Sequence, residues 1–408
     1  MDFNTLSVVG LGYIGLPTAA VFASRKMKVI GVDVSEKAVN TINRGEIHIV
    51  EPDLDLVVHA AVTEGYLRAT MTPEPADAFI IAVPTPFKDN HEADLTYIES
   101  ASKAIAPVLK KGNLVILEST SPIGATEKMA EWLAEARPDL SFPQFNGCDS
   151  DIRIAHCPER VLPGHVLREL VENDRVIGGM SPACSEAAIA LYKTVVKGEC
   201  VVTNARTAEM AKLTENSFRD VNIAFANELS CVCDELDINS RELINLTNHH
   251  PRVEILNPGC GVGGHCIAVD PWFIVSSSPS LTPLIRTARQ VNDNKKRWVI
   301  DKVLLQSLDY EKINGLPPVI GCFGITFKSD IDDLRESPAV DIVRSLINLK
   351  QQILVCEPNI NKHPEFELST IDDTVQNSNI LVFLVAHTAF KGIDISNHKI
   401  IDICGVID

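Results

Sequence analysis

The chain has 408 residues, of which 37 are basic and 54 acidic, giving a formal net charge of −17. This length exceeds one ordinary core and predicts two or three domains. The acidic balance argues against a nucleic-acid partner, which needs a basic face. Eleven cysteines in so long a chain do not resemble the dense disulfide framework of small secreted domains. Their spacing is poor for zinc, so no metal is expected.

The N-terminus has no basic stretch of the kind that opens a signal peptide, and it leads directly into a strand. No apolar run approaches the roughly 20 residues that a membrane span needs. These features predict a reduced, cytoplasmic protein without a membrane partner.

The first predicted elements are a strand at 6–9, a helix at 16–24 and a strand at 28–33. A Gly-x-Gly-x-x-Gly fingerprint at 10–15 joins the first strand to the helix, and an acid ends the second strand. In this context the fingerprint predicts a dinucleotide site, the alternative being a purely structural βαβ unit. The expected cofactor contacts are Gly10, Gly12, Tyr13, Ile14, Gly15 and Asp33.

Each part of this fingerprint has a mechanical role. Gly10 permits the tight turn, Gly12 lets the backbone approach a pyrophosphate, and Gly15 lets the helix close on the strand. The pyrophosphate is then expected at the N-terminus of the helix. Asp33 can accept hydrogen bonds from ribose hydroxyls and would repel a 2′-phosphate, so NAD is favoured over NADP.

Further strands are predicted at 78–83, 113–118 and 152–155. Because ligands bind beyond the carboxyl ends of strands in open α/β sheets, Thr85 and Thr120 fall where cofactor and substrate are expected. Thr120 has a second interpretation, as the N-cap of a helix over 123–135. Glu159 follows the third strand and is either a site carboxylate or a solvated surface acid.

A glycine-rich loop at 259–266 presents Cys266 after four glycines. Such a loop lets the backbone approach a ligand closely, so the thiol is a candidate nucleophile. The alternative is a buried structural cysteine.

Between these regions, residues 207–234 are predicted to form a helix. Lys212 and Asn216 are four residues apart and share a face, with Arg219 one turn further along. This polar stripe is either a solvated face or one that looks into a cleft.

The last hundred residues return to alternating strands and helices, which predicts a second parallel sheet. A helix at 292–308 and a linker at 311–317 precede it. The expected strands and helix are 318–324, 337–349 (helix), 353–358 and 380–385. Lys328 and Arg335 follow the first of these strands and are candidates for phosphate or ribose binding, or else ordinary surface charges.

Taken together, these motifs resemble the UDP-glucose/GDP-mannose dehydrogenase family over nearly the whole chain. The matching pieces are the 10–15 fingerprint, Glu118-Ser119-Thr120, Pro158-Glu159, Lys212 with Asn216, Arg252, Gly263-Gly264-His265-Cys266 with Asp270, 324–328, and 335–338. The resemblance implies an NAD-binding Rossmann domain (1–200), a central helical dimerisation domain (201–300) and a C-terminal UDP-sugar-binding α/β domain (315–408). The fold class expected is therefore α/β, with two Rossmann-like parallel-sheet domains joined by helices.

The implied reaction oxidises a sugar C6 hydroxyl to a carboxylate with two NAD+. Cys266 would attack the C6 aldehyde, and the resulting thiohemiacetal would be oxidised to a thioester that water hydrolyses. Lys212 would stabilise the oxyanion, Asn216, Thr120 and Asp270 would position or activate water, and Glu159 would act as general acid or base. The expected substrate contacts are Glu159, Arg160, Lys212, Asn216, Arg219, Arg252, Gly263, Gly264, Phe327 and Lys328. Thr85, Thr120 and Arg335 complete the expected cofactor contacts.

Two departures from many family members narrow the substrate. Val269 stands where those members have a lysine, and the segment after Glu159 lacks their Phe-Leu pair and second glutamate. Both changes resemble the branch that oxidises UDP-N-acetylhexosamines, with UDP-N-acetyl-D-mannosamine expected and UDP-N-acetylglucosamine or another nucleotide sugar as the alternative. The product would enter surface polysaccharides such as enterobacterial common antigen. In a homodimer, Arg252 would reach the partner's pocket.

Two rival functions remain at this point. A two-electron β-hydroxyacid dehydrogenase also pairs a Rossmann domain with a helix carrying Lys and Asn, but it has no use for Cys266 or for residues 318–408. A non-catalytic NAD-binding regulator should have lost one of the expected catalytic side chains, and Cys266, Lys212, Asn216 and Asp270 are all present. Cys260 stands where the acetylhexosamine branch usually has proline, and a redox role for it is left open.

Overall fold

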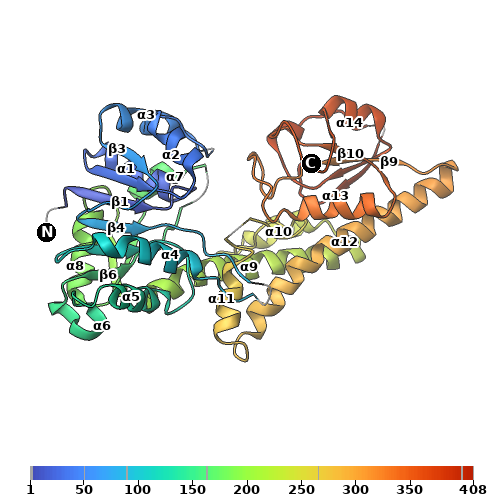
Figure 1. Ribbon diagram of the computed structural model, residues 1–408. Helices are drawn as coiled ribbons and strands as arrows, with labels where there is room; N and C mark the ends of the chain where they lie inside the picture. Colours follow the sequence, from blue (N-terminus) through green and yellow to red (C-terminus); the bar gives the residue numbers. More distant parts are fainter. Residues whose placement is uncertain are drawn as a thin grey trace. The chain divides into compact units, whose positions relative to one another are not determined.

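A computed structural model of the chain describes residues 3–49, 51–88, 91–161, 164–264, 266–396 and 398–407. Two compact units are distinguished, Met1–Thr214 and Glu215–Asp408. Each contains a sheet in which nearly all neighbouring strands are parallel, so the predicted α/β class is confirmed (Figure 1). Within the described residues, no helix combines the length and apolar character that crossing a bilayer requires.

The first unit is built around an eight-stranded sheet with the order β3-β2-β1-β4-β5-β6-β7-β8. Its strands are β1 (Thr5–Val9), β2 (Lys28–Val32), β3 (Leu67–Thr70), β4 (Ala78–Ile81), β5 (Leu114–Leu117), β6 (Arg153–His156), β7 (Arg175–Gly179) and β8 (Cys200–Asn204). Its helices are α1 (Gly15–Ser24), α2 (Glu36–Asn43), α3 (Leu54–Thr63), α4 (Thr96–Ile105), α5 (Ala125–Ala136), α6 (Pro143–Asn146), α7 (Val166–Glu172) and α8 (Pro182–Tyr192), with short 3-10 turns at Ala106–Val108 and Gly147–Asp149. The order reverses between β1 and β4, the switch point at which such sheets bind ligands. The pair β6–β7 is antiparallel, and every other neighbouring pair is parallel.

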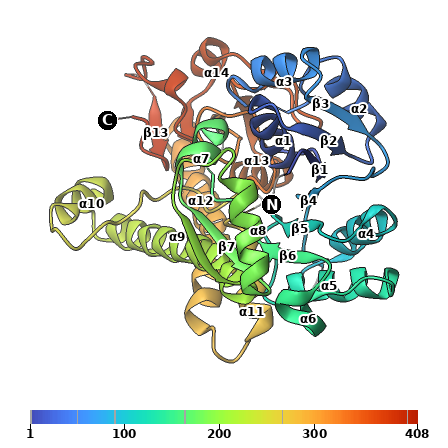
Figure 2. The ribbon, with the colours of Figure 1, turned by 90° about the vertical axis from the view of Figure 1, so that its left-hand side faces the viewer.

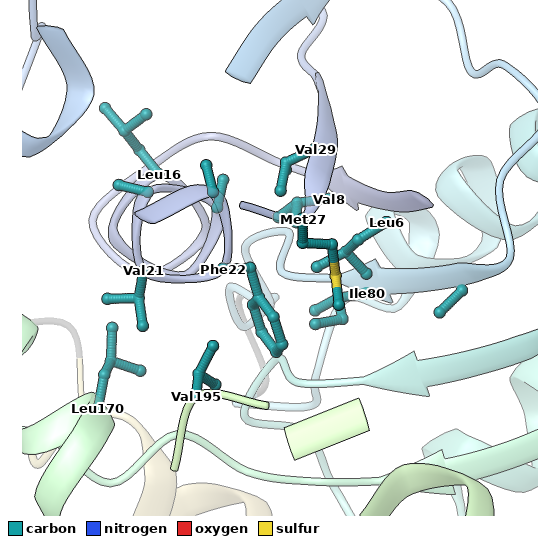
Figure 3. Packing of buried hydrophobic residues seen from close by; sticks show 14 of the residues in the cluster. Leu6, Val8, Leu16, Val21, Phe22, Met27, Val29, Ile80, Leu170 and Val195 are labelled. Atoms are coloured by element: carbon teal, nitrogen blue, oxygen red, sulfur yellow. The ribbon is translucent and has the colours of Figure 1, made fainter. Parts of the chain in front are cut away.

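Both faces of this sheet are buried, because successive strand residues alternate between two apolar clusters. In β4, Ile80 belongs to one cluster, while Phe79 and Ile81 belong to the other. The first cluster joins the strands to α1, α7 and the segment after α8. In Figure 3, Phe22 of α1 lies among the labelled residues of this cluster. The second joins them to α4 and α5, which lie side by side in Figure 2. Covered faces of this kind explain why the strands appear in the sequence as continuous apolar runs.

Helix α9 (Ala205–Glu235) begins in the first unit and ends in the second. The second unit continues with the helices α10 (Ser240–Asn248), α11 (Asp270–Ser277), α12 (Pro283–Asn314), α13 (Pro338–Asn348) and α14 (Ile371–Asn377). Its sheet has the order β11-β10-β9-β12-β13 and is parallel throughout. The strands are β9 (Val319–Phe323), β10 (Gln352–Cys356), β11 (Leu368–Ser369), β12 (Ile380–Phe383) and β13 (Lys399–Asp402), with a 3-10 turn at Thr388–Phe390. Helix α13 packs against α12, as Figure 1 shows.

The expected linker at 311–317 is wrong in its first half, and the expected helix at 292–308 is too short at both ends. Helix α12 starts at Pro283, in the first turn where proline's missing N–H costs nothing, and it runs to Asn314. Gly315 ends the helix in the left-handed conformation, at φ 75°, and its N–H bonds to the Glu311 carbonyl. Gly315 therefore ends the helix, and the charged residues Glu311 and Lys312 belong to its last turn.

Candidate functional site

The fingerprint loop in the first unit has the geometry predicted for its three glycines. Gly10 has φ +91°, and a Cβ there would lie 2.6 Å from the carbonyl oxygen of Ala82. A Cβ on Gly15 would lie 1.8 Å from the Gly10 carbonyl oxygen, whereas a Cβ on Gly12 would have no neighbour within 4 Å in the part of the chain that the structure describes. The loop is therefore closed on the protein side and open at Gly12, where a pyrophosphate needs to approach.

Helix α1 begins next to this space, and among the described residues no side chain at its N-terminus accepts hydrogen bonds from its first N–H groups. Its N-cap residue, Ile14, offers no side-chain cap, and the first turn contains no acidic residue. The leading N–H groups and the positive end of the helix dipole are thus suited to an anion. Tyr13, the remaining predicted contact in the loop, is partly buried against the first apolar cluster.

Asp33 lies at the carboxyl end of β2 and is fixed by two backbone donors. Its Oδ2 accepts from Leu11 N at 2.9 Å and its Oδ1 from Ser35 N at 2.8 Å. A carboxylate pinned to the fingerprint loop in this way retains lone pairs for ribose hydroxyls. The Thr85 hydroxyl oxygen is buried and has no partner among the described residues. This orphaned group beyond β4, together with Gly12 and α1, fits a dinucleotide.

The loop after β5 holds Thr120 half-buried and places its neighbours firmly. The Ser119 hydroxyl donates to the carbonyl oxygens of Ile81 and Val83, at 3.3 and 2.8 Å. The interpretation of Thr120 as a helix N-cap is wrong, because α5 begins after Gly124, which has φ +94°. Glu209 of α9 caps that helix instead, accepting from Gly124 N at 2.6 Å and Thr126 N at 2.8 Å.

Glu159 is not a solvated surface acid, since only 7% of it is exposed. Its Oε2 pairs with the buried Arg175 guanidinium at 2.7 Å, and its Oε1 accepts from Arg160 N at 2.7 Å. Arg175 also lies 3.4 Å from Glu118 Oε1. Burial raises the pKa of Glu118 to about 7, and the charge of Glu159 adds to this, while Arg175 and hydrogen bonds oppose it. The predicted Arg160 is half-buried on this loop, and its guanidinium donates to the Asp174 carbonyl at 3.4 Å.

In the second unit, the structure brings Asn216 and Asp270 together. Asn216 Nδ2 donates to Asp270 Oδ2 at 2.5 Å, and both side chains are buried. The interpretation of this helix face as solvated is therefore wrong at Asn216. Asp270 begins α11, and the N–H groups of Asp270 and Val269 both bond to the Cys266 carbonyl, at 2.9 and 3.0 Å.

These two bonds form a tight turn that carries the half-buried Cys266 directly into α11. The predicted nucleophile and the Asn216–Asp270 pair are thus connected through five residues of chain. His265, which belongs to the same motif, lies outside the described residues.

The glycines before Cys266 pack against the loop that follows β9. A Cβ on Gly263 would lie 2.5 Å from the Glu336 carbonyl oxygen and 2.7 Å from Phe327 Cβ. Gly264 has φ +81° and faces the Phe327 ring, and its N–H donates to the Arg335 carbonyl at 3.0 Å. The sequence placed Phe327, Gly263 and Gly264 at one substrate site, and the structure brings these three residues into contact.

The remaining predicted residues are cations. Lys212 lies half-buried on α9, four residues before Asn216, whereas Arg219 and Arg252 are exposed. Lys328 is half-buried, and its carbonyl accepts from the Thr326 hydroxyl at 2.8 Å. The Arg335 guanidinium pairs with Asp333 at 2.6 Å. Apart from Lys212 these side chains lie in the second unit, and their roles stay predictions.

Two features of the structure were not found from the sequence. One is the buried pairing of Arg175 with Glu118 and Glu159. The other holds the loop after β9: Glu357 Oε2 accepts from Ile325 N at 2.8 Å and from the buried His387 Nε2 at 3.0 Å. His387 Nδ1 accepts from Asp330 N at 2.9 Å, so its proton lies on Nε2. An acid that ends a buried strand, as Glu118 and Glu357 do, was the available signal.

Cys260 does not have the character of a reactive thiol. Its side chain is buried in the apolar cluster of the second unit, and its Sγ donates to the Leu384 carbonyl at 3.1 Å. Burial raises its pKa to about 12. A thiolate is accordingly disfavoured at this position.

Comparison with known proteins assigns all three parts of the chain to one family. Residues 4–196, 206–294 and 321–408 match, respectively, the NAD-binding, central and UDP-binding domains of the UDP-glucose/GDP-mannose dehydrogenase family. A UDP-N-acetyl-D-mannosamine dehydrogenase from Yersinia pestis is 63% identical over 418 residues, covering 100% of both chains. An NDP-N-acetyl-D-galactosaminuronic acid dehydrogenase from Ralstonia nicotianae is 62% identical, covering 97% of this chain and 93% of the relative.

A solved structure agrees with this assignment. The UDP-D-ManNAc dehydrogenase of Pyrococcus horikoshii superimposes with a TM-score of 0.91 at 38% identity, covering 99% of this chain and 96% of the other. The predicted cofactor, NAD, is confirmed by the match of residues 4–196. The match of residues 321–408 to a UDP-binding domain removes the β-hydroxyacid dehydrogenase alternative, which has no such region.

Proposed function

The chain belongs to the UDP-glucose/GDP-mannose dehydrogenase family, and from that premise we propose that it oxidises UDP-N-acetyl-D-mannosamine at C6 to the carboxylate. The observation that carries this proposal is the Cys266–Asp270 turn, held against α9 through the buried Asn216–Asp270 hydrogen bond. The mannosamine substrate is supported by the 63% identical relative and by the solved structure at 38% identity.

The chemistry follows from the side chains of the chain, with NAD+ accepting a hydride in each of two oxidations. The alcohol is first oxidised to the aldehyde, and the Cys266 thiolate then adds to the aldehyde carbon. Oxidation of the thiohemiacetal gives a thioester, which water hydrolyses to the carboxylate and the regenerated thiol. Lys212 stabilises the oxyanion that forms when the sulfur adds, since it offers a full charge from the same helix that carries Asn216.

Water must attack the thioester, and it must not reach the sugar carbon before the thiohemiacetal has been oxidised. The position of the water therefore has to be controlled. Asn216 and Asp270 are suited to this role because their hydrogen bond fixes both groups before substrate arrives. Thr120 assists in placing water. Glu159 serves as general acid or base, because it is a buried carboxylate that follows the end of a strand and is held in place by Arg175.

The comparisons support a second candidate sugar besides the mannosamine. The Ralstonia relative is named for an N-acetyl-D-galactosaminuronic acid, so UDP-N-acetyl-D-galactosamine is a second candidate beside the mannosamine. UDP-N-acetylglucosamine stays a third, since discrimination among such epimers depends on pocket geometry. An aminouronic acid made by this reaction would serve surface polysaccharides of the enterobacterial common antigen type, and the reaction is placed in the cytoplasm.

We further propose that the protein acts as a homodimer through α9. Phe218, Phe225 and Val232 are spaced seven residues apart on this helix, and all three are exposed. An exposed apolar stripe with that spacing is typical of a helix that packs against another helix. Arg252, which is exposed after α10, would then reach the partner's substrate. The domain limits 1–200, 201–300 and 315–408 are retained as part of this proposal.

The test is NADH formation by purified protein with NAD+ and UDP-N-acetyl-D-mannosamine, beside the galactosamine, glucosamine and glucose analogues. We expect two NADH per mannosamine substrate consumed and little product from the others. Cys266→Ser should lose turnover while retaining NAD binding, and Cys148→Ser, at an exposed cysteine, should keep both. One NADH per sugar, or full activity of Cys266→Ser, would contradict the thioester mechanism. Preference for another sugar would contradict only the substrate assignment.

A further inference from the structure

The first unit buries three charged groups in one cluster at the carboxyl ends of β5 and β6. The Arg175 side chain is 5% exposed, that of Glu118 is fully buried, and that of Glu159 is 7% exposed. Arg175 Nη1 lies 2.7 Å from Glu159 Oε2 and 3.4 Å from Glu118 Oε1. One guanidinium is thus shared between two carboxylates, with the shorter contact to Glu159. Two buried carboxylates face one buried cation, and burying charges that are not fully paired costs stability. The arrangement therefore requires an explanation other than stability.

The remaining groups around the cluster hold Glu118 and Arg175 in place. The Thr18 and Tyr192 hydroxyls each donate to Glu118 at 3.1 Å. The Arg175 guanidinium also stacks over the Tyr192 ring, 4.5 Å from its centroid. Two thiols interact electrostatically with the cluster: Cys157 with Arg175 and Glu118, and Cys200 with Arg175. Cys200 in turn interacts with Lys193, Asp174 and Glu199.

We infer that Arg175 and Glu118 are positioning residues that fix the orientation and the charge of Glu159, an inference that rests on the proposed acid–base role of Glu159. Arg175 orients the Glu159 carboxylate through the 2.7 Å contact, and Glu118 determines how much of the guanidinium charge Glu159 receives. Neither Arg175 nor Glu118 is assigned a contact with substrate.

The coupling follows from the charges. When Glu118 is protonated, Arg175 is paired with Glu159 alone and stabilises the ionised Glu159 carboxylate. When Glu118 ionises, the two carboxylates compete for one cation, and Glu159 receives less of the guanidinium charge. Burial raises the pKa of Glu118 to about 7, so this exchange falls in the physiological pH range. The charge that Glu159 receives from Arg175 therefore depends on the protonation state of Glu118.

Glu118→Gln tests this inference with little change in shape. The amide oxygen can still accept from Thr18 and Tyr192, but the group no longer ionises. Glu209→Gln is the matched control: Glu209 is another buried glutamate of the same unit, burial also raises its pKa, and it caps α5 instead of contacting Arg175. The measurement is the pH profile of kcat from pH 5.5 to 9, with the rate of Cys266 alkylation followed in parallel to account for titration of the thiol.

We expect Glu118→Gln to shift the profile of kcat by about one pH unit or more, as the loss of a neighbouring charge commonly does. The alkylation profile should stay unchanged, and Glu209→Gln should keep the wild-type kcat profile. Arg175→Lys, which keeps a charge but not the two-sided guanidinium geometry, should lower kcat more than it raises KM. An unchanged kcat profile in Glu118→Gln, or an equal change in Glu209→Gln, overturns the inference. Full activity of Glu159→Gln would instead contradict the proposed role of Glu159 itself.

Discussion

Replacing Gly263 by alanine would insert a methyl group into space that the facing loop already occupies. The added Cβ would lie 2.5 Å from the Glu336 carbonyl oxygen, 2.7 Å from Phe327 Cβ and 2.8 Å from Pro338 Cδ. Two of these contacts involve main-chain or ring-bound atoms that cannot rotate away. The backbone of Gly263 itself does not have a positive φ, so the strain comes from the contacts rather than from the conformation of the residue.

The structure sets the size of the displacement. Ordinary contacts of a Cβ begin at 3.4 Å, so relief of the 2.5 Å contact requires the two loops to separate by about 0.9 Å. Overpacking of this kind costs about 1–3 kcal/mol of stability. The larger effect should be on catalysis, because Cys266 is three residues away and a shift of about 1 Å in a reacting group can cost about 100-fold.

Gly259→Ala is the control in the same loop, since its Cβ would meet none of the described residues within 4 Å. We expect Gly263→Ala to lower kcat/KM by about 100-fold with folding and NAD affinity retained, and Gly259→Ala to keep nearly full activity. The assays are NADH formation, calorimetric titration with NAD+ and thermal unfolding. A folded Gly263→Ala protein with kcat/KM within about twofold of wild type would refute the packing argument.

Three further changes have defined outcomes. Gly12→Ala meets nothing within 4 Å in the described part of the chain, so the melting temperature should hold while NAD affinity, measured by titration, falls about tenfold or more where the pyrophosphate approaches. Because the pKa of Glu118 is raised in the folded protein, ionisation of Glu118 disfavours the folded state. Relative to Glu118→Gln, the free energy of unfolding of the wild type should be greatest below pH 4.5 and should fall by about 3 kcal/mol as the pH rises to about 7. Denaturant unfolding measures this difference. Arg289→Met leaves the buried Asp220 without the guanidinium 2.6 Å away and should cost about 3–5 kcal/mol, most of it recovered in the double variant with Asp220→Asn.

The sequence predicted the strands and helices well where a local pattern determines them. The fingerprint at 10–15 required a strand, a turn and a helix, and β1, α1 and β2 form them. The predicted linker at 311–317 misplaces the end of α12, because the helix continues through residues 311–314 to Gly315. Local helix propensity and a glycine stop would have located this boundary.

Burial of the polar residues could not be predicted in the same way. Asn216 has the spacing of a solvated stripe, and only the arrival of Asp270 from 54 residues further along the chain places it in the interior. Lys212, one turn before it, is still half-buried. Periodicity describes a helix by itself, whereas the burial of each face depends on which distant segment packs against it.

The pairing of Arg175 with Glu159 depends on a single reversal in the sheet. In the antiparallel pair of β6 and β7, Ala155 lies opposite Gly179 and His156 opposite Gly178. Continuing that register three places beyond His156 sets Glu159 opposite Arg175, the first residue of β7. Had β6 and β7 been parallel, like the other neighbouring strand pairs of this sheet, Arg175 would start its strand at the opposite edge, and both glutamates would be buried without this cation. The direction of this one strand, which no local motif specifies, therefore decides whether a carboxylate at the end of β6 can be kept charged and oriented for chemistry.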